Sequence, residues 1–149
     1  MKKYRLAGRR FELLGEKNGV KIIHDYAHHP SEIAACLKAA THYPHHKIWA
    51  VFQCNSYTRA KTLKNKYAKS FADADMVIVP DIYPGRDIDK GEIHARDLVG
   101  AIAGYNKNVI YIKTFEEINA YLENHAHKGD IVITLGSGSV NTESLKLLK

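Results

Sequence analysis

The chain has 149 residues, 45% of them hydrophobic and 26% charged, with a formal net charge of +6; these values fit one folded domain and exclude collagen-like, fibrous and disordered chains. No apolar run approaches the roughly 18 residues that a membrane-spanning helix needs, so we expect no membrane segment. The two cysteines, Cys36 and Cys54, are too few for a disulfide framework, which favours reduced thiols and a cytoplasmic location.

The first predicted elements are a hairpin and a helix. The pattern of a strand occurs twice, in Arg10–Glu16 and in Val20–Tyr26. Between them, Asn18-Gly19 is a strong signal for a tight turn. We therefore expect these two strands to be antiparallel. A helix is predicted from Pro30, which suits a first helical turn, to the break at Pro44.

The rest of the chain alternates between short apolar strands and helices. After Pro44 we expect the strand Ile48–Gln53, a helix capped by Ser56, the strand Met76–Ile82, the helix Glu92–Ala103, the strand Val109–Ile112, a helix capped by Thr114, the strand Asp130–Leu135 and a terminal helix Thr142–Leu148. This order predicts an α/β domain with five strands connected by helices and one antiparallel strand. The longest expected loop is Tyr83–Gly91.

Polar, titratable and glycine residues gather where the predicted strands end. They form the four runs His24–Pro30, Gln53–Arg59, Asp81–Arg86 and Gly136–Ser139. Since open α/β sheets bind ligands beyond the carboxyl ends of their strands, this edge is the expected binding edge. The opposite edge has mostly turn residues, as in Lys128-Gly129-Asp130 and Asp73-Ala74-Asp75.

These residues alone leave several chemistries open. The Gly136–Ser139 loop, between a strand and a helix, suits an anion, and the guanidinium groups of Arg59 and Arg86 suit a carboxylate or phosphate. Two alternatives remain at the first run. One is a divalent metal held among His24, Asp25, His28 and His29, and the other is an acid–base pair of Asp25 and His28. The sequence has neither a P-loop nor a Gly-x-Gly-x-x-Gly motif, so any ATP chemistry needs a triphosphate loop outside this chain.

Nucleic-acid binding is a further alternative, because basic residues concentrate mildly at Lys2–Arg10 and Lys61–Lys69. The second stretch also fits the solvent-facing side of a helix. Neither an arginine stripe nor an aromatic RNA-binding motif accompanies them. A solvated basic surface is therefore the favoured interpretation.

In their order along the chain, the strand-end runs resemble the C-terminal domain of the Mur ligases. The resemblance rests on Arg9–Glu12, Asp25–Pro30, Phe52-Gln53 with Ser56–Arg59, and Asp81–Pro84 with Arg86. It extends from about Tyr4 to Leu148, so residues 1–149 are identified as one such domain. It implies a Rossmann-like three-layer fold with a mixed, mainly parallel six-stranded sheet. It also implies that a UDP-sugar domain and a central ATPase domain, with the P-loop and the magnesium ligands, are absent from this chain.

The activity implied by the resemblance is that of a bacterial ATP-dependent ligase of peptidoglycan synthesis. Such an enzyme activates UDP-N-acetylmuramate as an acyl phosphate and joins it to L-alanine. The implied roles are catalysis by His28, nucleotide contacts by Arg10, Asp25 and Tyr26, and substrate contacts by Tyr26, His29, Arg59, Arg86, Gly136, Ser137 and Gly138. The implied cofactors are ATP and magnesium, with no metal ligand in this chain. The implied partners are L-alanine, ATP, UDP-N-acetylmuramate and the absent domains, and neither nucleic acid nor membrane.

The chain departs from the commonest family pattern at two places. His24 stands where aspartate is frequent, and Cys54-Asn55-Ser56 replaces a frequent proline-histidine-arginine, so Arg59 is the only guanidinium in its segment. The alternatives are a ligase that reattaches recycled peptide to UDP-N-acetylmuramate, and a non-catalytic nucleotide- or anion-binding module. We expect Cys54 to be an exposed thiol beside the cleft. Without a P-loop, the isolated domain is expected to be inactive.

Overall fold

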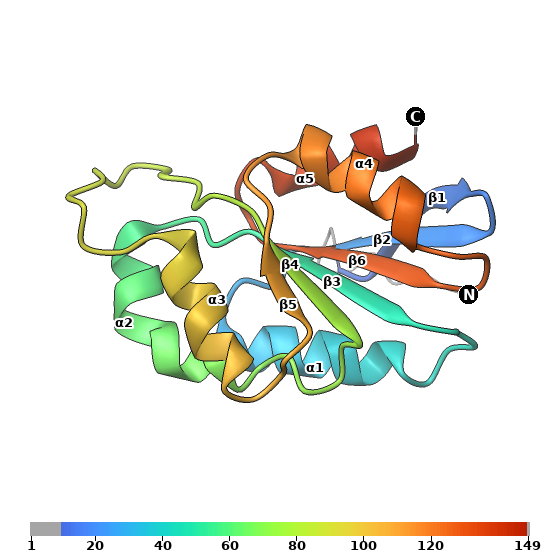
Figure 1. Cartoon of the computed structure of the whole chain (residues 1–149), viewed down its shortest axis with the longest axis horizontal. Coiled ribbons are helices and arrows are strands. Elements are labelled where there is room, and N and C mark those ends of the chain that lie inside the picture. The colour runs from blue at the N-terminus through green and yellow to red at the C-terminus, as the bar shows by residue number, and fades with distance from the viewer. Residues whose placement is uncertain (1–9, 149) are drawn as a thin grey trace.

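The structure is a computed structural model that describes residues 10–148, so the Lys2–Arg10 stretch and the Arg9–Glu12 run lie in part outside the described residues. Its strands are β1 (Glu12–Lys17), β2 (Val20–Asp25), β3 (Ile48–Phe52), β4 (Met76–Val79), β5 (Val109–Tyr111) and β6 (Ile131–Leu135). They form one six-stranded sheet in the order β1-β2-β6-β3-β4-β5 (Figure 1). Only β1 and β2 pair antiparallel among these strands, which confirms the predicted mixed, mainly parallel sheet.

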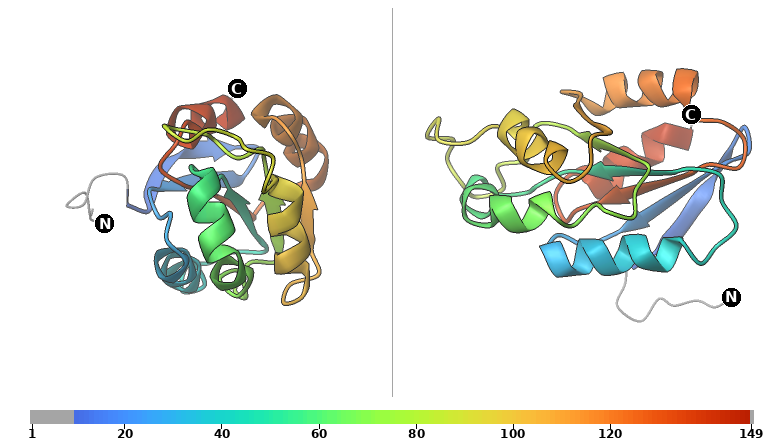
Figure 2. Two further views of the ribbon diagram at one scale, coloured as in Figure 1. Left: turned by 90° about the vertical axis from the view of Figure 1, so that its left-hand side faces the viewer. Right: turned by 60° about the horizontal axis from the view of Figure 1, so that its bottom comes forward.

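Helices cover both faces of the sheet and give the molecule three layers (Figure 2). One face carries α1 (Pro30–Ala40), α2 (Tyr57–Ala68) and α3 (Ala95–Ala103); the other carries α4 (Phe115–His125), the short α5 (Val140–Glu143) and a 3₁₀ helix, η1 (Ser144–Leu148). The buried side chains form two matching clusters: Leu37 and Leu98 belong to the first, Ile118 and Val140 to the second. Because both faces are buried, β3 and β6 are apolar throughout almost their entire length.

The predicted helix starts at Ser56 and Thr114 are confirmed. The Ser56 hydroxyl accepts the backbone N–H of Arg59 at 3.0 Å, and the Thr114 hydroxyl accepts that of Glu117 at 3.2 Å. Each bond satisfies one of the N–H groups that the first turn of a helix leaves unpaired. Within residues 10–148 no helix is long and apolar enough to cross a membrane.

Two helices differ from the sequence prediction. α3 begins at Ala95 and not at Glu92, because Nδ1 of His94 accepts the N–H of Arg96 at 3.0 Å and so makes His94 the cap. The terminal helix begins at Val140 and not at Thr142, and it changes to a 3₁₀ helix after one turn. Its first N–H is accepted at 3.0 Å by the side chain of Gln53, which lies far away in the sequence.

The strands β2, β3 and β5 end one residue earlier than predicted, and β4 ends three residues earlier. β4 ends at Val79 and not at Ile82. Pro80 follows Val79 directly and has no N–H to continue the ladder of hydrogen bonds.

Candidate functional site

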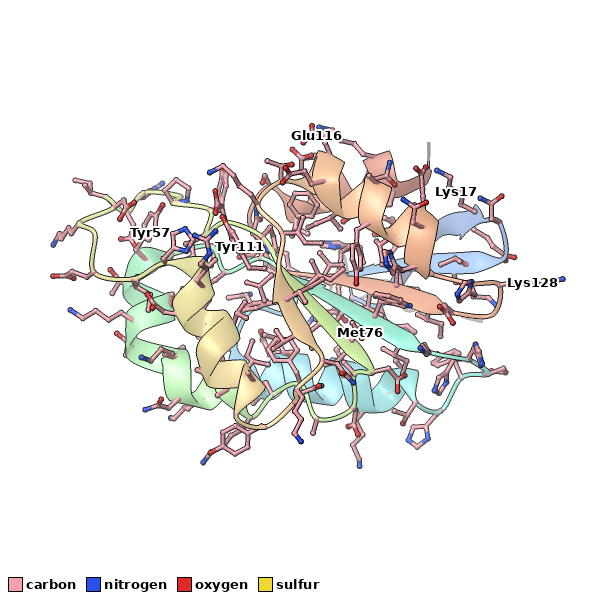
Figure 3. The ribbon with its side chains drawn as sticks, in the orientation of Figure 1. Lys17, Tyr57, Met76, Tyr111, Glu116 and Lys128 are labelled. Atoms are coloured by element: carbon pink, nitrogen blue, oxygen red, sulfur yellow. The ribbon has the colours of Figure 1, made fainter. Side chains whose placement is uncertain are left out.

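The carboxyl ends of four adjacent strands bring the predicted runs together. Because β2, β6, β3 and β4 are neighbours in that order, the segments after them form one continuous carboxyl rim. The rim consists of residues 25–29, 136–139, 53–59 and 81–87. Backbone bonds join its segments: Gly136 N–H donates to the Asp25 carbonyl at 3.2 Å, and Tyr83 N–H to the Cys54 carbonyl at 2.8 Å. In Figure 3, Tyr57 marks this end of the molecule and Lys128 the opposite end.

Asp25 is buried at the end of β2, with both carboxylate oxygens bonded to the backbone. Oδ1 accepts the N–H of Ala27 at 2.8 Å, and Oδ2 accepts the N–H of Phe11 at 3.0 Å. Phe11 has a φ of +45°, a conformation that a bulky residue rarely adopts, and the bond to Asp25 helps to hold it. Asp25 therefore shapes the rim in this structure, and its contact with a nucleotide stays a prediction.

Glu32, in the first turn of α1, joins three predicted site residues and was missed by the sequence analysis. Its Oε1 accepts the backbone N–H groups of His28 and His29, both at 3.2 Å, and its Oε2 lies 3.4 Å from Nη2 of Arg10. Partial burial raises the pKa of Glu32. The N–H bonds from His28 and His29, together with the electrostatic effect of the His28 and Arg10 side chains, outweigh burial and hold the pKa below its ordinary value. The signal in the sequence was the capping spacing between His29 and Glu32.

His28, the predicted catalytic side chain, is half-buried and oriented by its neighbours. Its Nδ1 lies 3.0 Å from the Tyr26 carbonyl, and its ring is edge-on to the Tyr26 ring at 5.3 Å between centroids. A carbonyl only accepts, so this bond places the proton on Nδ1 and leaves Nε2 as the acceptor of a neutral ring. The ring of His29, which is exposed, lies 4.8 Å from that of His28.

The described residues do not fit a metal site at this end of β2. No group of three His, Cys, Asp or Glu side chains within residues 10–148 is arranged to hold a metal ion. His24 is 2% exposed, and its Nδ1 lies 3.0 Å from Oγ1 of Thr134 on β6. His24 is thus directed along the sheet and not toward His28.

Arg59 lies in the first turn of α2 and reaches the glycine loop through Asn55. Its Nη1 donates to Oδ1 of Asn55 at 2.6 Å, and Nδ2 of Asn55 donates to Oγ of Ser137 at 2.5 Å. A second amide holds the far end of the same loop, since Nε2 of Gln53 donates to Oγ of Ser139 at 3.1 Å. The structure therefore brings Arg59 and the Gly136–Ser139 loop together, and their contact with a substrate stays a prediction.

The two glycines of the loop are needed for close approach. At Gly136, where φ is +139°, a Cβ atom would lie 2.6 Å from the carbonyl oxygen of Gln53. At Gly138 a Cβ atom would lie 2.7 Å from the ring of Tyr83. The loop therefore passes between the Gln53 carbonyl and the Tyr83 ring, and neither glycine position has room for a side chain.

Arg86 lies in a different part of the rim from Arg59. It is exposed, has no hydrogen bond or ion pair with any residue of the described range, and lines a groove of about 530 Å³ together with Tyr57 and Lys61. The loop that carries it is fixed by Asp87, which accepts the hydroxyl of Ser56 at 2.6 Å. The groove does not include Arg59, so the two predicted guanidinium groups do not line one pocket.

The expectation of an exposed thiol at Cys54 is wrong. Cys54 is 1% exposed, and Cys36 is buried as well; both are free thiols. Burial raises the pKa of the Cys54 thiol, so it stays protonated and unreactive at neutral pH. The side chain follows a strand that is buried on both faces, and it continues that apolar layer beneath the rim.

Comparison with known proteins relates the whole described chain to one family. Residues 9–138 match the family model of the Mur ligase, glutamate ligase domain. A UDP-N-acetylmuramate–L-alanine ligase from Alkaliphilus metalliredigens is 52% identical over 132 residues, which are 89% of this chain and 28% of that protein. The protein of the same name from Caldanaerobacter subterraneus is 43% identical over 149 residues, which are 100% of this chain and 32% of that protein. The chain thus spans less than a third of the length of these curated relatives.

The fold is shared with solved structures of much lower identity. The crystal structure of a UDP-N-acetylmuramate–alanine ligase from Thermotoga maritima matches with a TM-score of 0.72 at 20% identity. The match covers 93% of this chain and 29% of that one. At this identity the likeness concerns the fold, which agrees with the sheet order and layers described above.

Proposed function

The chain belongs to the Mur ligase family, and from this premise we propose that it acts as the C-terminal domain of an ATP-dependent ligase that joins L-alanine to UDP-N-acetylmuramate in peptidoglycan synthesis. The observation that carries the proposal is the Arg59 guanidinium, held beside the Gly136–Ser139 loop at the carboxyl rim with one nitrogen bonded to the protein. The 52% identity to a protein named for this reaction supports it.

In the proposed reaction, Arg59 holds the carboxylate of L-alanine while the amine attacks the acyl phosphate. A guanidinium presents two parallel N–H groups to a carboxylate, which a lysine does not. A new C–N bond forms, the C–O bond to phosphate breaks, and phosphate leaves. His28 receives the proton of the attacking amine on Nε2, since Nδ1 is bonded to the Tyr26 carbonyl. The L-alanine end of the proposed site is lined by Gly136, Ser137 and Gly138. Further substrate contacts are assigned to His29 and Arg86.

The nucleotide side of the proposal involves Arg10, Asp25 and Tyr26. The triphosphate loop and the magnesium ligands belong to other domains of the enzyme, because this chain has no P-loop and its described residues do not fit a metal. Closure of those domains onto the carboxyl rim would exclude water from the acyl phosphate, which water would otherwise hydrolyse. A reaction that consumes ATP and a nucleotide sugar places the enzyme in the cytoplasm.

The proposal is tested by phosphate release from the full-length ligase with ATP, UDP-N-acetylmuramate and L-alanine. Arg59→Ala should raise the KM for L-alanine by about 10- to 100-fold, the effect of losing a charge-assisted bidentate contact, with a smaller change in kcat. Lys66→Ala removes a positive charge from the exposed side of the same helix and should leave both constants unchanged. An unchanged KM for Arg59→Ala would remove Arg59 from the amino-acid site.

The choice of acceptor is tested in the same assay. L-alanine should support turnover, and a recycled peptide should not. Turnover with the peptide alone would replace the proposed function by the recycling reaction. The 149-residue chain by itself should hydrolyse no ATP, and ATP turnover by this chain would contradict the need for other domains.

A further inference from the structure

We infer that Asn55 is a positioning residue that directs two hydrogen-bond donors, one from Arg59 and one from Ser137, toward the same ligand carboxylate. The inference rests on the proposed function, in which that carboxylate belongs to L-alanine. It extends the proposed function by assigning a role to an amide at a position where the family more often has another side chain.

The chemistry of the neighbours fixes how the Asn55 amide is turned. An arginine side chain has only donors, so the group 2.6 Å from Nη1 of Arg59 must be the amide oxygen. The amide nitrogen then faces Oγ of Ser137, at 2.5 Å, and donates to it. The reversed amide would place two donors against each other at Arg59.

This orientation leaves the Ser137 hydroxyl as a donor. Its oxygen accepts from Asn55, so its proton is free to be given to another acceptor. Within residues 10–148 the Ser137 hydroxyl donates to no other group, and the side chain is half-buried at the rim. The Ser137 proton is therefore available to a ligand.

The same amide orients Arg59 without neutralising it. The backbone of Arg59 is held by the Ser56 hydroxyl at 3.0 Å, and the guanidinium is held by the neutral Asn55 oxygen at 2.6 Å. The other guanidinium nitrogens make no hydrogen bond within the described residues and keep their donors. A carboxylate at position 55 would hold the guanidinium equally well, but it would cancel the charge that attracts an anion.

The two donors also fit one ligand group in size. Asn55 spans the distance from Arg59 to Ser137 with a single carboxamide. The guanidinium and the hydroxyl are therefore separated by no more than one carboxamide and two hydrogen bonds, which is close enough for a ligand carboxylate beside Asn55 to accept from both. Unlike the amide, it accepts at both ends, which matches the two donors that Asn55 leaves.

The test exploits this difference between an amide and a carboxylate. In the full-length ligase, Asn55→Asp keeps the shape of the side chain, but it accepts the Ser137 proton and pairs with Arg59. We expect it to raise the KM for L-alanine by about tenfold or more, with a smaller change in kcat. Asn55→Ala loosens Arg59 but leaves its charge, and should raise the KM less than Asn55→Asp. A merely structural role predicts the reverse order, because Asp preserves the geometry and Ala does not.

Two further variants complete the design. Ser137→Ala should raise the KM in the wild-type background and add little to Asn55→Asp, whose carboxylate has already taken the Ser137 proton. Asn119→Asp makes the same charge change on α4, beside the hairpin, and should leave the KM unchanged. Additive effects of Asn55→Asp and Ser137→Ala, or an Asn55→Asp enzyme with the wild-type KM, would overturn the inference.

The geometry is tested separately in the 149-residue chain. Side-chain NMR signals of the Arg59 guanidinium should show restricted rotation in wild type and in Asn55→Asp, and faster rotation in Asn55→Ala. Equal rotation in all three would overturn the inference whatever the substrate is. If Arg59→Ala leaves the KM unchanged, the proposed role of Arg59 fails; if only the Asn55 variants leave it unchanged, the inference alone fails.

Discussion

At the amino edge of the sheet, where β3 and β6 begin, Asp130 is 1% exposed. Its oxygens accept the indole N–H of Trp49 and the N–H of His127, both at 2.9 Å, and the N–H of Lys47 at 3.1 Å. At the carboxyl rim, Arg59 donates to one protein acceptor through its guanidinium, and Arg86 to none within the described residues. The hydrogen-bonding capacity of Asp130 is used by the fold, while the two rim guanidinium groups retain donors for a ligand. Unused donors thus distinguish the two rim arginines from the structural carboxylate of Asp130.

The largest expected effect comes from Asp130. Asp130→Ala leaves three buried or half-buried donors without an acceptor and should lower the free energy of unfolding by about 3–5 kcal/mol. Urea denaturation followed by the fluorescence of Trp49 measures it. Asp130→Asn keeps the volume and one acceptor oxygen and should cost less. A loss below about 1 kcal/mol in the free energy of unfolding for Asp130→Ala would contradict the structural role of Asp130.

Gly136→Ala tests whether the rim is as tightly built as its glycines indicate. The added Cβ atom would lie 2.6 Å from the Gln53 carbonyl oxygen at a φ of +139°, and we expect a loss of about 2–3 kcal/mol in the free energy of unfolding. Gly100→Ala is the matched control, because Gly100 lies inside α3 with no atom within 4 Å of the added Cβ. It should gain about 0.5–1 kcal/mol in thermal or urea unfolding. Equal effects at the two glycines would contradict the close approach.

Glu32 is a rim carboxylate used by the fold, and its substitution should have the smallest effect on stability. Its pKa is lower in the folded state than its ordinary value, so the stability it contributes is present above that value and lost as the pH falls through the folded pKa. Wild type should therefore lose more stability than Glu32→Gln between pH 7 and pH 3. The difference should be below about 1 kcal/mol, because the side chain is 30% exposed. If urea denaturation at several pH values shows the same loss of stability toward low pH for wild type and Glu32→Gln, Glu32 does not have this role.

The parts of the structure that depend on local chemistry were predictable. The Asn18-Gly19 turn, the Ser56 and Thr114 caps and the apolar strands follow from neighbouring residues. The parallel pairing of β2, β6, β3 and β4 confirms that the strand-end runs share one edge, and ligand binding at that edge stays a prediction. The start of α3 was missed because histidine is an uncommon cap.

The long-range hydrogen bonds of the structure were not predictable, because they join residues distant in the chain. Asn55 meets Ser137 82 positions away, and Trp49 meets Asp130 81 positions away. Such pairs depend on which strands are neighbours, and a single sequence does not give the strand order. Glu32 is partly an exception, since two of its three partners, His28 and His29, lie only four and three positions before it. The burial of Cys54 likewise depends on the layer that covers the end of β3.

The order of the strands has a consequence for biosynthesis. β6 is the last strand to be synthesised, yet it lies between β2 and β3 and pairs with both. Until residues 131–135 leave the ribosome, β2 and β3 have no common partner, and each exposes an unpaired apolar edge. The nascent domain therefore cannot complete its sheet before β6 is synthesised, and its open strand edges are exposed to aggregation until then. A chain released before Ile131 would lack the strand that joins β2 to β3 and would leave an edge of each strand unpaired.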